Sequence, residues 1–145
     1  MAAPKGSGKA IRSKSTGKPI YLPASKRTGP WEEAVVAAAL PHRPAEPLDC
    51  AVELWVVFYL PRPKSLPKHV TEPARRPDKS KLVRCLEDGI TRAGIWTDDA
   101  RVVFTVSRKA FAGGVHDPQG SSGIPRAEVR VREAQAVAQV AEVRL

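Results

Sequence analysis

The longest apolar stretch of this chain, residues 50–60, constrains its fold more than any other feature. It holds 11 residues, is interrupted only by Glu53 and is closed by Pro61. Val, Leu, Trp, Phe and Tyr dominate it, which favours a β-strand over a helix at this length. Because both faces of this strand are apolar, we predict that it lies in the centre of a sheet. The stretch is too short to cross a bilayer.

Two helices are expected on either side of this strand in the sequence. The first begins near Pro30, since proline is favoured at the first helical position, and it ends before Pro41. The second runs from about residue 80 to residue 92, with Ser80 as its expected N-cap and Gly94 placed to end it. Its apolar side chains share one face, so this helix is amphipathic.

Two shorter strands complete the expected fold. Residues 102–106 are predicted to be a strand that carries Val102, Phe104 and Val106 on one face, and residues 127–131 resume strand-like alternation. A proline-rich segment, residues 61–77, and a glycine-rich segment, residues 113–125, are expected to be loops. The predicted fold class is therefore α+β, a small mixed sheet packed with two helices.

The basic residues of this chain lie mostly in two blocks. The whole chain has 24 Lys and Arg against 15 Asp and Glu, a net charge of +9, which is typical of proteins that bind nucleic acid. Residues 1–30 contain seven basic residues and no acid, and residues 61–84 contain eight basic residues against two acids. The first block is a phosphate-contacting arm or a solvated tail. The candidate DNA-binding residues are Lys5, Lys9, Arg12, Lys14, Arg62, Lys64, Lys68, Arg75 and Arg76.

Several other protein classes do not fit this sequence. Cys50 and Cys85 have no second cysteine pair, which argues against a disulfide scaffold and against a four-cysteine zinc site. The basic N-terminus has no apolar segment of the kind that signal peptides carry. We therefore expect a cytoplasmic protein with no membrane contact. A basic RNA-binding protein of the ribosomal type remains an alternative, although most aromatic residues belong to the expected strands or begin an element.

Acidic residues gather at three points within the otherwise basic second half. Asp78 precedes the second helix, Glu87 and Asp88 share that helix's polar face with Arg84, and the pair Asp98 and Asp99 directly precedes a strand. If the helix turns back onto this strand, Asp98 or Asp99 comes to lie beside the polar face. These five carboxylates are the candidate metal ligands.

Carboxylates held close together raise each other's pKa unless a cation offsets them. A hard divalent ion such as Mg²⁺ prefers oxygen ligands, and beside phosphates it can polarise a phosphoryl oxygen and activate water. Acids within a DNA-binding surface therefore indicate a nuclease. The alternative is that they are helix caps and ion-pair partners on an exposed helix.

An ordered set of short segments resembles a known family. Residues 58–65 (FYLPRPKS) are followed by residues 76–78 (RPD), 81–84 (KLVR), 88–91 (DGIT) and 94–103 (GIWTDDARVV). This order and spacing resembles the RusA-type Holliday junction endodeoxyribonucleases of bacteria and their phages. The resemblance covers the chain to about Val131. It implies an endonuclease domain over residues 1–132, with residues 1–28 as a basic, loosely ordered arm, and a C-terminal tail over residues 133–145.

The resemblance implies a homodimer that cuts four-way DNA junctions in recombination and repair, with Mg²⁺ as cofactor, Mn²⁺ as a possible substitute and no small-molecule cofactor. Asp78 matches the first aspartate of the family's site, Asp88 the helix aspartate, and Asp99, with Asp98 beside it, the last. Arg84 stands where the family has a lysine near the scissile phosphate. These matches imply catalytic roles for Asp78, Asp99 and Arg84.

One departure from the family pattern bears on activity. The family usually has a second aspartate two residues after the first, and this chain has Ser80 there. Glu87 lies on the same helix face and is a possible replacement, although a hydroxyl or a water is another. A non-catalytic protein that binds branched DNA is therefore the alternative function.

Overall fold

The computed structural model describes residues 9–12, 19–22, 28–120 and 123–134. Within these ranges the longer elements are helices α1 (Thr28–Ala39) and α2 (Lys79–Ala93) and strands β3 (Val52–Leu60), β4 (Val102–Phe111) and β5 (Arg126–Glu133). The short elements are strands β1 (Lys9–Arg12) and β2 (Pro19–Leu22) and two 3-10 turns, η1 (Leu40–His42) and η2 (Asp99–Arg101).

The apolar stretch forms β3, and β3 is the central strand as predicted. The main sheet has the order β4-β3-β5, with β4 parallel and β5 antiparallel to β3. Alternate residues of β3, from Val52 to Leu60, point to the helix side and are buried, whereas Trp55 and Val57 on the other side are partly exposed. The mixed sheet and the two helices confirm the predicted α+β class.

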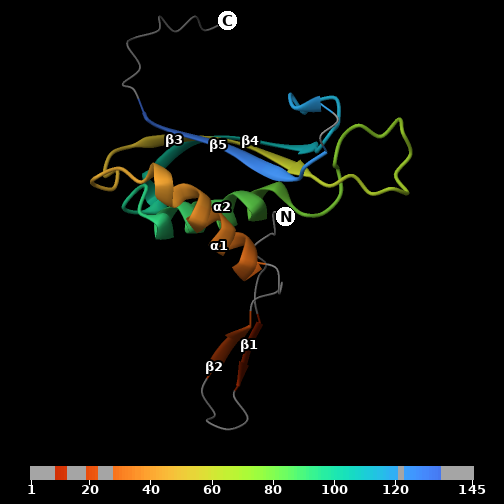
Figure 1. Ribbon diagram of the computed structural model, residues 1–145. Coiled ribbons are helices and arrows are strands. Elements are labelled where there is room, and N and C mark those ends of the chain that lie inside the picture. The colour runs from red at the N-terminus through yellow and green to blue at the C-terminus, as the bar shows by residue number, and fades with distance from the viewer. Residues whose placement is uncertain (1–8, 13–18, 23–27, 121–122, 135–145) are drawn as a thin grey trace, which may run out of the picture.

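Both helices cover one face of this sheet (Figure 1). Because β3 and β4 are parallel, the chain must cross back between them, and α2 makes this crossover. The C-terminal end of α2 therefore lies near the beginning of β4, and its N-terminal end lies near the end of β4. This direction of α2 decides where its acidic residues come to lie.

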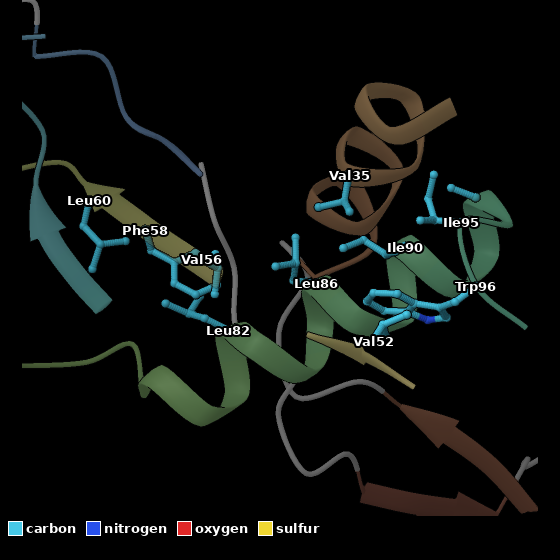
Figure 2. Close-up of a cluster of buried hydrophobic side chains, with 11 residues drawn as sticks. Val35, Val52, Val56, Phe58, Leu60, Leu82, Leu86, Ile90, Ile95 and Trp96 are labelled. Atoms are coloured by element: carbon cyan, nitrogen blue, oxygen red, sulfur yellow. The ribbon is translucent and has the colours of Figure 1, made fainter. Parts of the chain in front are cut away.

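The hydrophobic core lies between α2, α1 and the helix side of β3 (Figure 2). Leu82 packs among the β3 side chains, and Ile90 faces Val35 of α1. Trp96 is 1% exposed and closes the core beyond the end of α2, where its indole N–H donates to Thr91 Oγ1 at 2.6 Å. Burial of this face anchors α2 and leaves its polar face outward.

Two details of the strands were not predicted. β1 and β2 pair antiparallel, and Ile11, Ile20 and Tyr21 within them have high β propensity; most of residues 1–28, which were expected to be loosely ordered, lie outside the described residues. A register shift between Val52 and Glu53 also leaves one extra residue in β4, so that Val102 packs against the core while Phe104 contacts Trp55 on the opposite face. The prediction that Val102 and Phe104 share a face was wrong because this bulge breaks the alternation.

The described helices include none that is long and apolar enough to span a membrane. Residues 135–145, most of the predicted tail, lie outside the described residues.

Candidate active site

Asp78 lies at the N-terminal end of α2. It adopts an extended backbone conformation (φ −69°, ψ 135°) and is the N-cap of the helix, although its side chain makes no capping hydrogen bond. Its carboxylate is exposed and lies 3.6 Å from Lys81 Nζ. Ser80, which was predicted as the N-cap, falls in the first turn instead, because the helix already begins at Lys79.

Two lysines that the sequence analysis missed position this end of α2. Lys109 Nζ donates to the carbonyl oxygens of Arg75 and Pro77, both at 2.9 Å, and Lys79 Nζ donates to the Ser107 carbonyl at 3.2 Å. These bonds tie the segment before Asp78 to the C-terminal half of β4. Lys109 follows Ser107 and Arg108 in a polar stretch of β4, so its sequence position carried no distinct signal for such a role.

Of the other candidate acids, Glu87 and Asp88 lie just past the middle of α2, and Asp98 and Asp99 follow the end of the helix. Gly94 adopts a left-handed conformation (φ 73°) that ends the helix, as predicted, and the chain turns back toward the sheet. Asp98 Oδ1 accepts a hydrogen bond from the Ala100 amide at 2.8 Å and so caps η2, in which Asp99 is the first residue. Asp99 begins η2, which leads directly into β4 at Val102, and η2 lies in contact with α2.

The pKa of Glu87 identifies the acids that interact. Burial raises this pKa first, and the negative charges of Asp99 and Asp88 raise it further, whereas Arg84 lowers it. The charge of Asp99 thus acts on the polar face of the helix, while the grouping of these acids into one site stays a prediction. Arg84 is exposed and lies one turn before Glu87 on the same helix.

Asp78 is separated from this group. It precedes Glu87 by nine residues, which corresponds to about 13 Å along a helix axis. Within residues 28–120 and 123–134, no three His, Cys, Asp or Glu side chains are grouped so that they could hold a metal ion. The structure therefore does not gather the five predicted ligands into one group: among them, it relates Glu87 to Asp99 and Asp88, whose charges act on it.

The basic loop between β3 and α2 presents most of its cations outward. Lys64, Lys68, Arg75 and Arg76 are exposed. Arg62 differs, because its guanidinium donates to the carbonyl oxygens of Val70 and Pro67, the latter at 2.7 Å, and stacks on the ring of Phe111 at 5.1 Å. Its placement shows a role in holding the loop, and its predicted contact with DNA stays a prediction.

Of the four predicted DNA-binding residues in the arm, Lys9 and Arg12 begin and end β1. Lys5 and Lys14 lie outside the described residues. The contacts of all four with DNA stay predictions.

Comparison with known families decides the class of protein. The family model described as endodeoxyribonuclease RusA matches residues 2–132. The chain belongs to the RusA endodeoxyribonuclease family. The RusA resemblance inferred from the short segments is confirmed, and the family is one of Holliday junction resolving endonucleases. Membership in this family favours the endonuclease hypothesis and the branched-DNA-binding hypothesis over the hypothesis of an RNA-binding protein. No curated protein matches this chain in a sequence comparison.

Proposed function

We propose that this RusA family member is a structure-selective endonuclease that cuts four-way DNA junctions during recombination and repair in a bacterium or a phage-infected cell. Its cofactor is Mg²⁺, with Mn²⁺ as a substitute. The observation that carries the proposal is the match of the endodeoxyribonuclease RusA family model to residues 2–132. The contact between α2 and η2, which brings the charge of Asp99 to bear on Glu87, supports it. Like charges held together in this way are stabilised by a divalent cation.

Each group of residues has a distinct part in this function. The exposed cations of the loop before α2 contact phosphates and position the junction without reading its sequence. Arg84 neutralises charge on a phosphate beside the acids, although its planar guanidinium is not equivalent to the lysine of the family. A bound divalent ion would polarise a phosphoryl oxygen and activate a water. The proposed ligands are Asp78, Glu87, Asp88, Asp98 and Asp99.

Cleavage of a synthetic four-way junction by purified variants tests the proposal. Asp99→Asn keeps the shape of the side chain and removes its charge. Loss of an outer-sphere partner of a metal costs up to about a hundredfold in activity, so we expect the loss of a direct ligand to lower cleavage by more than that. Binding to the junction should be unchanged or tighter. Glu46→Gln, an exposed acid in the loop after η1, is the matched control and should cut normally.

Glu87→Gln asks whether the helix acid compensates for Ser80. If it does, this variant loses activity as Asp99→Asn does. Normal cleavage by Glu87→Gln, together with inactive Asp78→Asn and Asp99→Asn, would show that the enzyme works without a replacement for the missing aspartate.

The alternative function, branched-DNA binding without cleavage, is favoured by one observation. Ser80 occupies the first turn of α2, two residues after Asp78, where the family usually has its second aspartate. If the wild-type protein binds junctions but cuts none with Mg²⁺ or Mn²⁺, the binding function is correct. Cleavage recovered by Ser80→Asp would then locate the defect at that position.

A further inference from the structure

The outer edge of β5 has no covering element in the described part of the chain. In the main sheet β5 is hydrogen-bonded to β3 alone, so the backbone groups along its other edge have no strand partner among the described residues. On the helix side, α1 packs against α2, and Val129 of β5 remains 42% exposed. Proteins usually cover or otherwise protect a strand edge of eight residues, because such an edge pairs with other chains.

An apolar groove lies between this strand and α1. Its volume is about 790 Å³, and residues of α1, of α2 and of β5 from Arg126 to Val131 line it. Three of the α1 residues that line the groove are alanines, namely Ala34, Ala38 and Ala39. Their short side chains leave room for another segment of backbone beside β5.

The C-terminal segment of this chain, residues 135–145, starts close to the groove. Ala134 follows β5 directly, and its amide donates a hydrogen bond to the Ala51 carbonyl oxygen at 2.8 Å. This bond fixes the point from which the segment departs. Eleven extended residues span about 36 Å, whereas residues 126–131 of β5 span about 20 Å. The segment is therefore long enough to turn back and follow the whole groove.

Residues 141–145 alternate as a strand with one covered face does. Ala141, Val143 and Leu145 are apolar, and the residues between them, Glu142 and Arg144, are charged. This period of two favours a strand over a helix for these residues. Such a strand has an apolar face for the groove and a charged face for solvent.

β5 carries the same alternation along the groove. Ala127, Val129 and Val131 pair with residues of β3 that point to the helix side, so these three side chains share that side. Glu128 and Arg130 point to the opposite face of the sheet and are exposed. The two segments therefore match face to face if odd-numbered residues of one lie opposite odd-numbered residues of the other.

The charges select one register among those that match the faces. With residues 135–137 as a three-residue loop, a common length in hairpins, Val143 lies opposite Val129. Glu142 is then opposite Arg130, and Arg144 is opposite Glu128, so both charged pairs are of opposite sign.

The two neighbouring registers that keep the faces matched place like charges opposite each other. A shift of two residues in one direction puts Glu142 opposite Glu128, and the same shift in the other direction puts Arg144 opposite Arg130. Like charges directly opposite each other destabilise a sheet.

We propose that residues 138–145 form a fourth strand of the main sheet, antiparallel to β5 in this register, and that this strand fills the groove between β5 and α1. The occupant of the groove is the protein's own C-terminal segment. It supplies hydrogen-bond partners to the outer edge of β5 and covers Val129. Its apolar face also supports α1 from the side of the sheet.

A disulfide across the proposed register tests the placement. Val129→Cys and Val143→Cys are combined in the full chain, in which exposed Cys50 is replaced by serine and buried Cys85 stays. The Cβ atoms of directly opposite residues lie about 4.5–5.5 Å apart, close enough for a disulfide after a small adjustment. We expect mild oxidation to join these two thiols within one chain, as shown by mass spectrometry of the linked peptides.

The matched control pairs Val129→Cys with Ala138→Cys. Ala138 precedes Val143 by five residues, which is about 16 Å along a strand, so this pair should stay reduced under the same conditions. Equal oxidation of both pairs would show that the segment has no fixed position and would overturn the proposal. Two reactive thiols that form no disulfide would also overturn it. A disulfide between chains would show that a second copy fills the groove, and the proposal would be wrong.

A charge exchange tests the register without any covalent bond. Arg130→Glu and Glu142→Arg each place like charges opposite each other, so each variant should unfold at a lower urea concentration than the wild type. The double variant restores an opposite pair and should recover much of the loss in the urea midpoint. If the two losses simply add, the residues are not neighbours and the register is wrong. Neither experiment involves DNA cleavage, so both results are independent of the proposed nuclease function.

Discussion

Substitution of Gly89 by alanine tests the contact that positions α2. Gly89 lies in the middle of α2, where α1 crosses it, and is buried. A Cβ atom at this position would lie 2.7 Å from Val35 Cγ1, 2.9 Å from Val35 Cβ and 3.4 Å from the Glu32 carbonyl oxygen. The first two distances are shorter than real side-chain contacts allow. The two helices must therefore move apart to accept alanine.

Two opposing effects decide the sign of the change in stability. Alanine is favoured over glycine within a helix by about 1 kcal/mol. Overpacking of a well-packed interface costs about 1–3 kcal/mol, and here the obstructing atoms include a β-carbon fixed to the backbone of α1. We expect Gly89→Ala to lower the free energy of unfolding by about 1 kcal/mol, which corresponds to a fall of about 3 °C in Tm for a domain of this size.

Urea unfolding followed by far-UV circular dichroism measures this change. Gly29→Ala is the control, because a Cβ there has no neighbour within 4 Å, and its stability should be unchanged or slightly higher. Val35→Ala removes the Cγ1 atom, so the double variant should show a favourable coupling of at least about 0.5 kcal/mol. If Gly89→Ala instead stabilises the protein by about 1 kcal/mol, α1 and α2 do not approach as closely as described.

Two further predictions concern DNA binding and pH. Affinity for a junction should fall about a thousandfold between about 50 and about 200 mM salt if about six phosphates are contacted, and a flat salt titration would remove the electrostatic basis of binding. Hydrogen bonds from Arg126 and from the Gly113 and Gln119 amides hold the pKa of the buried Asp117 carboxyl well below its ordinary range, although burial by itself raises this pKa. The Asp117 carboxylate therefore stabilises the fold above about pH 4, and this contribution is lost as the pH falls further. Between pH 7 and pH 3 the midpoint of urea unfolding should fall less for Asp117→Asn than for the wild type.

The sequence alone was sufficient to predict those helices and strands in which buried and exposed residues follow a regular pattern. β3 was recognisable because one of its faces is buried under the helices and the other is apolar and half-buried, which leaves an apolar run with a single acidic interruption. α2 was recognisable because one face packs on β3 while the other remains polar. The bulge in β4 was not recognisable, because Val102, Phe104 and Val106 alternate in the sequence as regular strand residues do.

The candidate site was predictable in its parts. The residue types and the turn at Gly94 indicated that Asp98 or Asp99 would lie beside the polar face of α2 if the helix turned back onto the strand, and the structure shows the charge of Asp99 acting on Glu87. The placement of Asp78 beside the C-terminal half of β4 was not predictable, because it depends on the direction of α2 over the sheet and on the bonds from Lys79 and Lys109.

The local chemistry of this protein follows from its sequence alone: a basic surface, an acidic patch, a buried strand and an amphipathic helix. These features depend on the residue types and on their spacing over a few helical turns or strand positions. Only the tertiary structure decided that η2 comes into contact with α2, that Asp78 lies beside the C-terminal half of β4 and that β4 lies at the edge of the sheet. These results follow from strand order and from the crossover between parallel strands, which join segments far apart in the chain.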